Sequence, residues 1–185
     1  AFLKGELGYR VHGCEFESSA AEATRKNLDI IGVKNYKVYE GDFASVDFGE
    51  QKYDLIVSFG FIEHFENPAF IINKMKYLLK PKGILIVGIP NFNGINYIFA
   101  KATGLLPTHN LRVMRTKYLK TFPLKPISIE CVGGFEPAMY NITKASTLIK
   151  CLYYACILKF SNNLARLLSL EWYSSYIMAA YRKDR

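Results

Sequence analysis

The sequence predicts an α/β fold, in which a doubly wound, mostly parallel β-sheet has helices on both faces. Strand-like apolar runs alternate with amphipathic helical segments over the first half of the chain. The run over residues 53–58 is almost continuously apolar, which is typical of a strand covered on both sides. Strand–helix–strand units of this kind pair their strands in parallel.

The first predicted strand covers residues 9–15 and ends in an acidic residue. A helix is predicted over residues 18–31, with Ser18 or Ser19 as its N-terminal cap. The second strand follows at residues 36–39.

The third strand is predicted at residues 53–58 and the fourth at residues 84–89. Between them, residues 68–79 form an amphipathic helix. The apolar side of this helix consists of Phe70, Ile71, Met75 and Leu78.

Beyond residue 94 the pattern is less regular. Helices are predicted over residues 95–101 and 111–121, followed by a strand at residues 127–131. Residues 142–170 are predicted to be helical, and residues 173–181 form the last strand. No internal repeat or linker is visible, so residues 1–185 are predicted to form one domain.

Ligands of open α/β sheets bind beyond the carboxyl ends of the strands, which directs attention to the residues that follow each strand. Glu15 can accept hydrogen bonds from the two hydroxyls of a ribose, or it can cap a helix. Phe16 can stack on adenine or belong to the core. Asp42 can accept from an adenine amino group beside Phe43, or it can bond its own turn amides.

The third strand is followed by Ser58, Phe59 and Gly60, and the glycine would let backbone approach a ligand closely. His64 can act as a general base, or it can be a structural histidine bonded to backbone. Residues 90–94 follow the fourth strand, either at the same crevice or as an ordinary turn.

Four segments in this order resemble the motifs of class I, Rossmann-like S-adenosylmethionine-dependent methyltransferases. The segments are VHGCEFESSAAEAT, YEGDF, YDLIVSFGFIEHF and LLKPKGILIVGIPNFNG. They are most similar to the small-molecule branch that includes the ubiquinone-biosynthesis type. The resemblance covers residues 3–94, and SSYIMAAYRK at residues 174–183 is similar to the closing antiparallel strand of the family's seven-stranded sheet.

This resemblance implies S-adenosyl-L-methionine as cofactor and S-adenosyl-L-homocysteine as product. Glu15 would bind the ribose, and residues 58–60 would line the methionine side. The implied cofactor-binding residues are Glu15, Phe16, Asp42, Phe43, Ser58, Phe59 and Gly60.

The family's first strand and its glycine-rich loop have no counterpart in this sequence. In the family that strand lies between the strands that end here at Glu15 and Ser58. Without it, backbone groups of two buried strands would be unpaired. We therefore expect either an upstream segment of roughly 30–50 residues or another chain to fill this place.

The resemblance implies methyl transfer to a small, partly apolar acceptor. His64 and His109 are the candidate catalytic bases, although His109 can equally cap the following helix. Residues 92–170 are rich in aromatic groups and are predicted to form a lid over the acceptor site. The alternatives are core with a homodimer contact, or weak contact with a membrane surface.

Two other functions stay open. The chain could be a cofactor-free binding module with a methyltransferase-like fold. The net charge of +8 also suggests a methyltransferase for nucleic acid or protein. An NPPY-type tetrad is absent from the segment SFGFIEHF, which argues against adenine methylation, and no specific nucleic acid is expected.

The 4 cysteines form no CxxC pair and have no histidine cluster beside them, so no metal site is expected. No apolar run is long enough for a transmembrane helix, and we expect a cytoplasmic protein with reduced thiols.

Overall fold

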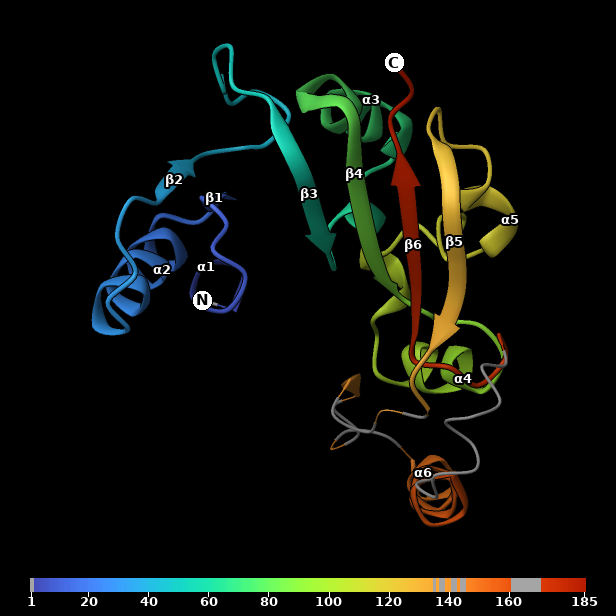
Figure 1. The fold of residues 1–185 in the computed structure, drawn as a ribbon. Helices are drawn as coiled ribbons and strands as arrows, with labels where there is room; N and C mark the ends of the chain where they lie inside the picture. Colours follow the sequence, from blue (N-terminus) through green and yellow to red (C-terminus); the bar gives the residue numbers. More distant parts are fainter. Residues whose placement is uncertain (1, 135, 137–138, 141–142, 144–145, 161–170) are drawn as a thin grey trace. The chain divides into compact units, whose positions relative to one another are not determined.

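The computed structural model describes residues 2–134, 136, 139–140, 143, 146–160 and 171–185 (Figure 1). The chain forms two compact units, Ala1–Gln51 and Lys52–Arg185, and each is described by itself. Strands of the described residues form a two-stranded sheet, β1-β2, and a four-stranded sheet, β3-β4-β6-β5. Within this described part, no helix has the length and apolar character needed to span a membrane.

The first unit is a strand–helix–strand motif. Its elements are α1 (Phe2–Gly5), β1 (His12–Glu15), α2 (Ser18–Ile30) and β2 (Lys37–Glu40). β1 and β2 pair in parallel, which places Glu15 opposite Glu40. Tyr39 and Phe48 pack together with ring centroids 4.8 Å apart and form part of this unit's core.

The predicted serine cap of α2 is wrong. The helix begins at Ser18, and the preceding Glu17 is the N-cap residue without a side-chain capping bond. Ser18 instead hydrogen-bonds the carboxylate of Glu40, which also contacts Arg25 at 3.2 Å. Both contacts lower the pKa of Glu40 because they favour its charged form. The Ser18 hydroxyl therefore bonds Glu40, which is distant in the sequence, and the local sequence pattern does not predict this partner.

The second unit contains the larger sheet. Its elements are β3 (Tyr53–Phe59), η1 (Ile62–His64), α3 (Pro68–Leu78), β4 (Leu79–Pro90), α4 (Ile95–Ala102), η2 (Leu106–Thr108), α5 (Thr116–Leu119), β5 (Lys125–Val132), α6 (Thr147–Phe160) and β6 (Tyr176–Arg182). β3 and β4 are parallel, whereas β6 runs antiparallel to both β4 and β5, as the arrows in Figure 1 show. The antiparallel last strand predicted from the family resemblance is confirmed.

β4 is a central strand of this sheet and supplies much of its core. Leu85, Val87 and Ile89 are fully buried. The neighbouring Gly88 has no room for a side chain, because a Cβ atom there would overlap the Phe59 ring and crowd the Met178 sulfur. These three side chains alternate along the strand and therefore share one face, whereas Ile84 and Ile86 on the opposite face are half-buried.

α3 begins at the predicted residue and ends one residue earlier than predicted, at Leu78, and its buried face differs slightly from the prediction. Asn67 caps the helix by accepting a hydrogen bond from the Phe70 amide at 3.4 Å, and Pro68 opens the first turn. Ile72 is fully buried, whereas the predicted core residue Phe70 is 53% exposed. Ile71, Met75 and Leu78 are buried as predicted.

The region after β4 differs from the prediction in two places. The helix expected over residues 111–121 is wrong, because residues 111–114 form turns and α5 covers only Thr116–Leu119. The helix expected over residues 142–170 is present as α6 at Thr147–Phe160. Residues 142, 144, 145 and 161–170 of the predicted range lie outside the described residues.

The two sheets end at the strands that the family resemblance places beside the absent first strand. Among the described residues, β1 pairs only with β2, and β3 pairs only with β4. Each sheet therefore has an edge strand, β1 or β3, with which an additional strand could pair. That an upstream segment or another chain supplies such a strand stays a prediction.

The buried face of β4 leads to a stability prediction. Replacing the fully buried Ile89 with Ala should lower the free energy of unfolding by about 2–5 kcal/mol, because the cavity forfeits packing and apolar burial. The same change at Ile127, which lies on β5 and is 51% exposed, should cost under about 1 kcal/mol. Urea unfolding followed by circular dichroism measures both, and equal losses would contradict the assigned core.

Candidate functional site

The carboxyl end of β1 presents a carboxylate and an exposed aromatic ring. Oε1 of Glu15 accepts a hydrogen bond from the Phe16 amide at 3.0 Å, and no described residue donates to Oε2. Phe16 is 67% exposed, so its interpretation as a core residue is wrong. The pair leaves a hydrogen-bond acceptor beside an open apolar surface.

Asp42, after β2, is held in its own turn. Oδ1 of Asp42 accepts from the Ala44 amide at 2.9 Å, and its backbone carbonyl accepts from Ser45 and Val46. Asp42 thus bonds an amide of its own turn through Oδ1, and its adenine contact stays a prediction. The neighbouring Phe43 packs against Phe48, with ring centroids 5.4 Å apart. Phe43 is half-buried.

The carboxyl end of β3 combines an unusual backbone with an unpaired hydroxyl. Gly60 has a φ of 60°, which glycine adopts without strain, and its amide donates to the Gly88 carbonyl at 2.9 Å. The Ser58 hydroxyl is buried and has no hydrogen-bond partner among the described residues. Phe59 is 62% exposed. The Ser58 hydroxyl is therefore a buried polar group whose hydrogen-bonding capacity is unsatisfied.

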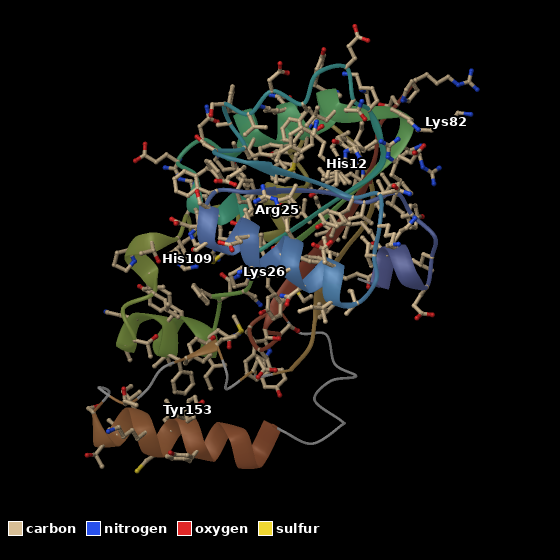
Figure 2. All side chains as sticks on the ribbon, turned by 90° about the vertical axis from the view of Figure 1, so that its left-hand side faces the viewer. His12, Arg25, Lys26, Lys82, His109 and Tyr153 are labelled. Atoms are coloured by element: carbon tan, nitrogen blue, oxygen red, sulfur yellow. The ribbon has the colours of Figure 1, made fainter. Side chains whose placement is uncertain are left out.

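The two predicted catalytic histidines lie side by side in the second unit. The His64 and His109 ring centroids are 4.6 Å apart. Nδ1 of His64 is 3.0 Å from the Thr108 carbonyl, and Nδ1 of His109 is 2.7 Å from the Leu105 carbonyl. His109 lies on the segment between α4 and α5 (Figure 2).

Burial lowers the pKa of His109, an effect that the Leu105 hydrogen bond opposes and the nearby His64 reinforces. Its imidazole is thus favoured in the neutral form, which is the form that can accept a proton. The interpretation of His109 as a cap for a following helix fails, since no such helix starts at residue 111.

Glu63 joins this histidine pair from η1. Glu63 is only 1% exposed, and its Oε2 atom has no hydrogen-bond partner among the described residues. Burial raises the pKa of Glu63, while backbone amides of Glu63 and Phe61 and the nearby His64 lower it. The sequence showed Glu63 next to His64, but no local pattern reveals that this carboxylate is buried.

An amide network holds the segment after β4 in place, and no local sequence pattern predicts it. The Asn91 side chain donates to the Glu171 carbonyl at 2.6 Å and to the Ser174 carbonyl at 2.7 Å. Asn96 donates to the Ser174 carbonyl at 2.9 Å and accepts from the Tyr140 hydroxyl at 3.0 Å. These buried bonds fasten the start of α4 to the segment before β6.

A cavity of about 500 Å³ opens beside this network. Its lining combines three aromatic side chains with one cationic and one anionic side chain, and consists of Phe92, Asn93, Gly94, Tyr97, Arg115, Glu171 and Trp172. Gly94 has a φ of 55°, and a Cβ atom there would overlap the Trp172 backbone. The close approach of these two segments therefore requires glycine.

Aromatic packing connects α6 to α4 near this cavity. Tyr153 lies on the face of α6 that is turned toward α4 (Figure 2), and its ring meets Phe99 edge-on with centroids 5.5 Å apart. Phe99 also contacts Tyr140 at 5.6 Å between centroids. All three residues are buried, so these members of the aromatic-rich region pack inside the unit.

Comparison with protein families gives one match. Residues 3–122 match the family model described as "Methyltransferase domain", which covers more than half of the chain. No protein of curated function is significantly similar to the chain in sequence.

Solved structures share the fold at low sequence identity. A protein assigned as a sarcosine dimethylglycine methyltransferase from Galdieria sulphuraria is 14% identical, with a TM-score of 0.63 over 99% of this chain and 73% of that one. A phosphoethanolamine N-methyltransferase from Haemonchus contortus, in complex with phosphomonomethylethanolamine and S-adenosylhomocysteine, is 16% identical. Its TM-score is 0.61, over 100% of this chain and 46% of that one.

A third structure of the same fold is the [4+2]-cyclase SpnF. It is 14% identical, with a TM-score of 0.59 over 95% of this chain and 67% of that one. Proteins of this fold therefore include one that is named for a different reaction.

The amide network leads to a second prediction. Asn91→Ala should lower the free energy of unfolding by about 1–3 kcal/mol, because buried carbonyls lose their donors. Asn73→Ala, at an exposed position of α3, should change it by no more than about 0.5 kcal/mol. Thermal unfolding by calorimetry compares the two variants. A harmless Asn91 substitution would show that the network does not hold this segment.

Proposed function

Because the chain belongs to the methyltransferase domain family, we propose that it transfers a methyl group from S-adenosyl-L-methionine to a small, partly apolar acceptor. S-adenosyl-L-methionine is the cofactor of such enzymes, and S-adenosyl-L-homocysteine is the product that remains. The family match supplies the reaction class. The nature of the acceptor is our inference from the second unit.

The residues after β1 and β2 fit the nucleoside part of this cofactor. Oε2 of Glu15 is available to accept hydrogen bonds from ribose hydroxyls. The exposed Phe16 ring offers a flat apolar surface for adenine. In this proposal Asp42 and Phe43 contact the adenine edge and face, with Oδ2 of Asp42 as the acceptor.

The residues after β3 fit the methionine part. The buried Ser58 hydroxyl can donate to a carboxylate or accept from an amine, either of which would fill its missing hydrogen bond. Gly60 presents backbone without a side chain in the way, and Phe59 is exposed beside it. We assign the methionine side of the cofactor to these three residues.

When bound, the cofactor supplies an electrophilic methyl group on a sulfonium that is already a good leaving group. The protein's task is then to align the acceptor with the methyl group and to exclude water. An acceptor hydroxyl or carbon acid must also lose a proton. His64 and His109 are the proposed groups for that step, and the depressed pKa of His109 supports a proton-accepting role.

We infer a small acceptor from the cavity beside the amide network. A volume of about 500 Å³ is in the range of small-molecule sites. Phe92, Tyr97 and Trp172 would contact an apolar body, while Arg115 and Glu171 would select polar groups of the acceptor. In this proposal residues 92–170 include the lid of the acceptor site, within a single enzyme domain that spans residues 1–185 and acts in the cytoplasm.

A cofactor-free protein of the same fold is the second candidate. The likeness to a [4+2]-cyclase supports it, because this fold serves more than one reaction. Cofactor binding separates the two candidates directly.

Calorimetric titration of the complete protein with S-adenosyl-L-homocysteine tests the proposal. The unaltered protein should bind one equivalent, and Glu15→Ala should weaken binding by about 10- to 150-fold, since a charged hydrogen bond is worth about 1.5–3 kcal/mol. The control Glu17→Ala removes an exposed carboxylate two positions away that makes no capping bond, and should leave the affinity unchanged.

No binding at millimolar ligand would overturn the methyltransferase proposal in favour of the cofactor-free protein. Equal effects of the Glu15 and Glu17 substitutions would refute only the ribose contact of Glu15.

A further inference from the structure

Three side chains with metal-binding atoms converge in the second unit. A carboxylate oxygen of Glu63, a ring nitrogen of His64 and a ring nitrogen of His109 all lie within 4.8 Å of one another. Glu63 and His64 come from η1, which follows β3, and His109 directly follows η2. The Asn110 amide donates to the Glu63 carbonyl at 2.6 Å and joins the two segments.

Backbone carbonyls orient both imidazole rings in the same way. Nδ1 of His64 lies 3.0 Å from the Thr108 carbonyl, and Nδ1 of His109 lies 2.7 Å from the Leu105 carbonyl. The Thr108 hydroxyl also lies 2.8 Å from Nδ1 of His109. Because a carbonyl only accepts, the tautomer that satisfies both carbonyl contacts has its proton on Nδ1. Nε2 of each ring then carries a lone pair, which is the arrangement that carbonyl partners impose on metal-binding histidines.

Glu63 adds a third electron-pair donor. Its residue is 1% exposed, and Oε2 has no hydrogen-bond partner among the described residues. A buried carboxylate oxygen without a partner is unfavourable unless a cation or a proton neutralises it.

Electron-pair donors gathered within 4.8 Å of one another, one of them on a buried carboxylate, are unfavourable unless a cation or a proton lies between them. A cation at their centre stabilises this arrangement. We propose that Glu63, His64 and His109 bind a divalent transition-metal ion.

The ligand chemistry narrows the choice of ion. Two imidazoles and one carboxylate suit Zn²⁺ and its neighbours such as Co²⁺, whereas Mg²⁺ prefers oxygen ligands throughout. A spread of 4.8 Å requires only a small inward movement of the side chains to reach metal-bond distances of about 2.0–2.2 Å. Since His64 is exposed, a further coordination position would be open to solvent or to another ligand.

This site uses none of the cysteines on which the expectation of no metal site was based. In an enzyme of the proposed function, the open position would hold an oxygen of the acceptor, and the bound ion would ease the loss of that oxygen's proton to water. His64 and His109, as metal ligands, would then not serve as bases, and this consequence rests on the proposed function. Metal binding itself does not rest on it.

The test is a titration of the complete, tag-free protein with Co²⁺ after removal of metals by a chelator. One equivalent of Co²⁺ should bind and produce the visible absorption of a low-coordinate nitrogen–oxygen site. An equivalent of Zn²⁺ should abolish this absorption, while the same concentration of Mg²⁺ should leave it unchanged. No binding at millimolar Co²⁺ would overturn the proposal and leave a shared proton as the cation, and displacement by Mg²⁺ would refute the transition-metal assignment.

Matched variants locate the ion. Glu63→Gln and His109→Asn should each weaken Co²⁺ binding at least tenfold. The controls are Glu66→Gln, an exposed carboxylate nearby, and His12→Asn, the third of the chain's 3 histidines, which lies in the first unit. Both controls should bind Co²⁺ as the unaltered protein does.

Far-UV circular dichroism establishes that each variant is folded. Folded Glu63→Gln and His109→Asn variants with unchanged Co²⁺ affinity would exclude the site, whatever the outcome of the cofactor titration. The unaltered protein provides an independent readout, since saturating Zn²⁺ should raise its melting temperature by binding the folded state.

Discussion

The parallel pairing of β3 with β4 determines where the chemistry of the second unit lies. Because parallel strands end at the same edge of a sheet, the pairing brings the residues after Phe59 beside those after Gly88. The Gly60 amide bonds the Gly88 carbonyl, and the absence of a side chain at Gly88 makes room for the Phe59 ring. The Ser58–Gly60 segment, η1 and the amide network around Asn91 all begin from this edge.

Much of this arrangement could be predicted from the sequence because local patterns encode it. The continuous apolar runs of β3 and β4 and the capped helix between them have short-range signatures. The roles of individual polar side chains were harder to predict, since they depend on distant partners. Ser18 bonds Glu40 rather than its own helix, and Asn91 bonds carbonyls some 80 residues away.

In the candidate site too, some features follow from local sequence patterns and others depend on distant partners. The positions of Glu15 and Ser58 at strand ends follow from sequence periodicity, and the exposure of Phe16 agrees with a ligand contact. Neither the meeting of His64 with His109 nor the burial of Glu63 has a local signal, because both depend on how the segment after α4 returns to η1. Tertiary contacts between segments more than 40 residues apart created this cluster.

The family match identifies the fold and the reaction class, whereas the acceptor depends on individual side chains. The family match establishes the methyltransferase domain, but the solved structures of this fold differ in what their names say they do. The function therefore depends on the side chains at the strand ends and on those that line the cavity of about 500 Å³, where our proposal places a small acceptor. In our proposal the contacts of Glu15, Phe16, Phe43 and residues 58–60 with the cofactor determine the function.

A crystal structure of the complete protein grown with S-adenosyl-L-homocysteine tests this claim most directly. The proposed function predicts ribose hydroxyls on the Glu15 carboxylate, adenine beside Phe16 and Phe43, and the homocysteine moiety along Ser58–Gly60. A ligand bound elsewhere, or crystals that contain no ligand after growth at millimolar concentration, would contradict it.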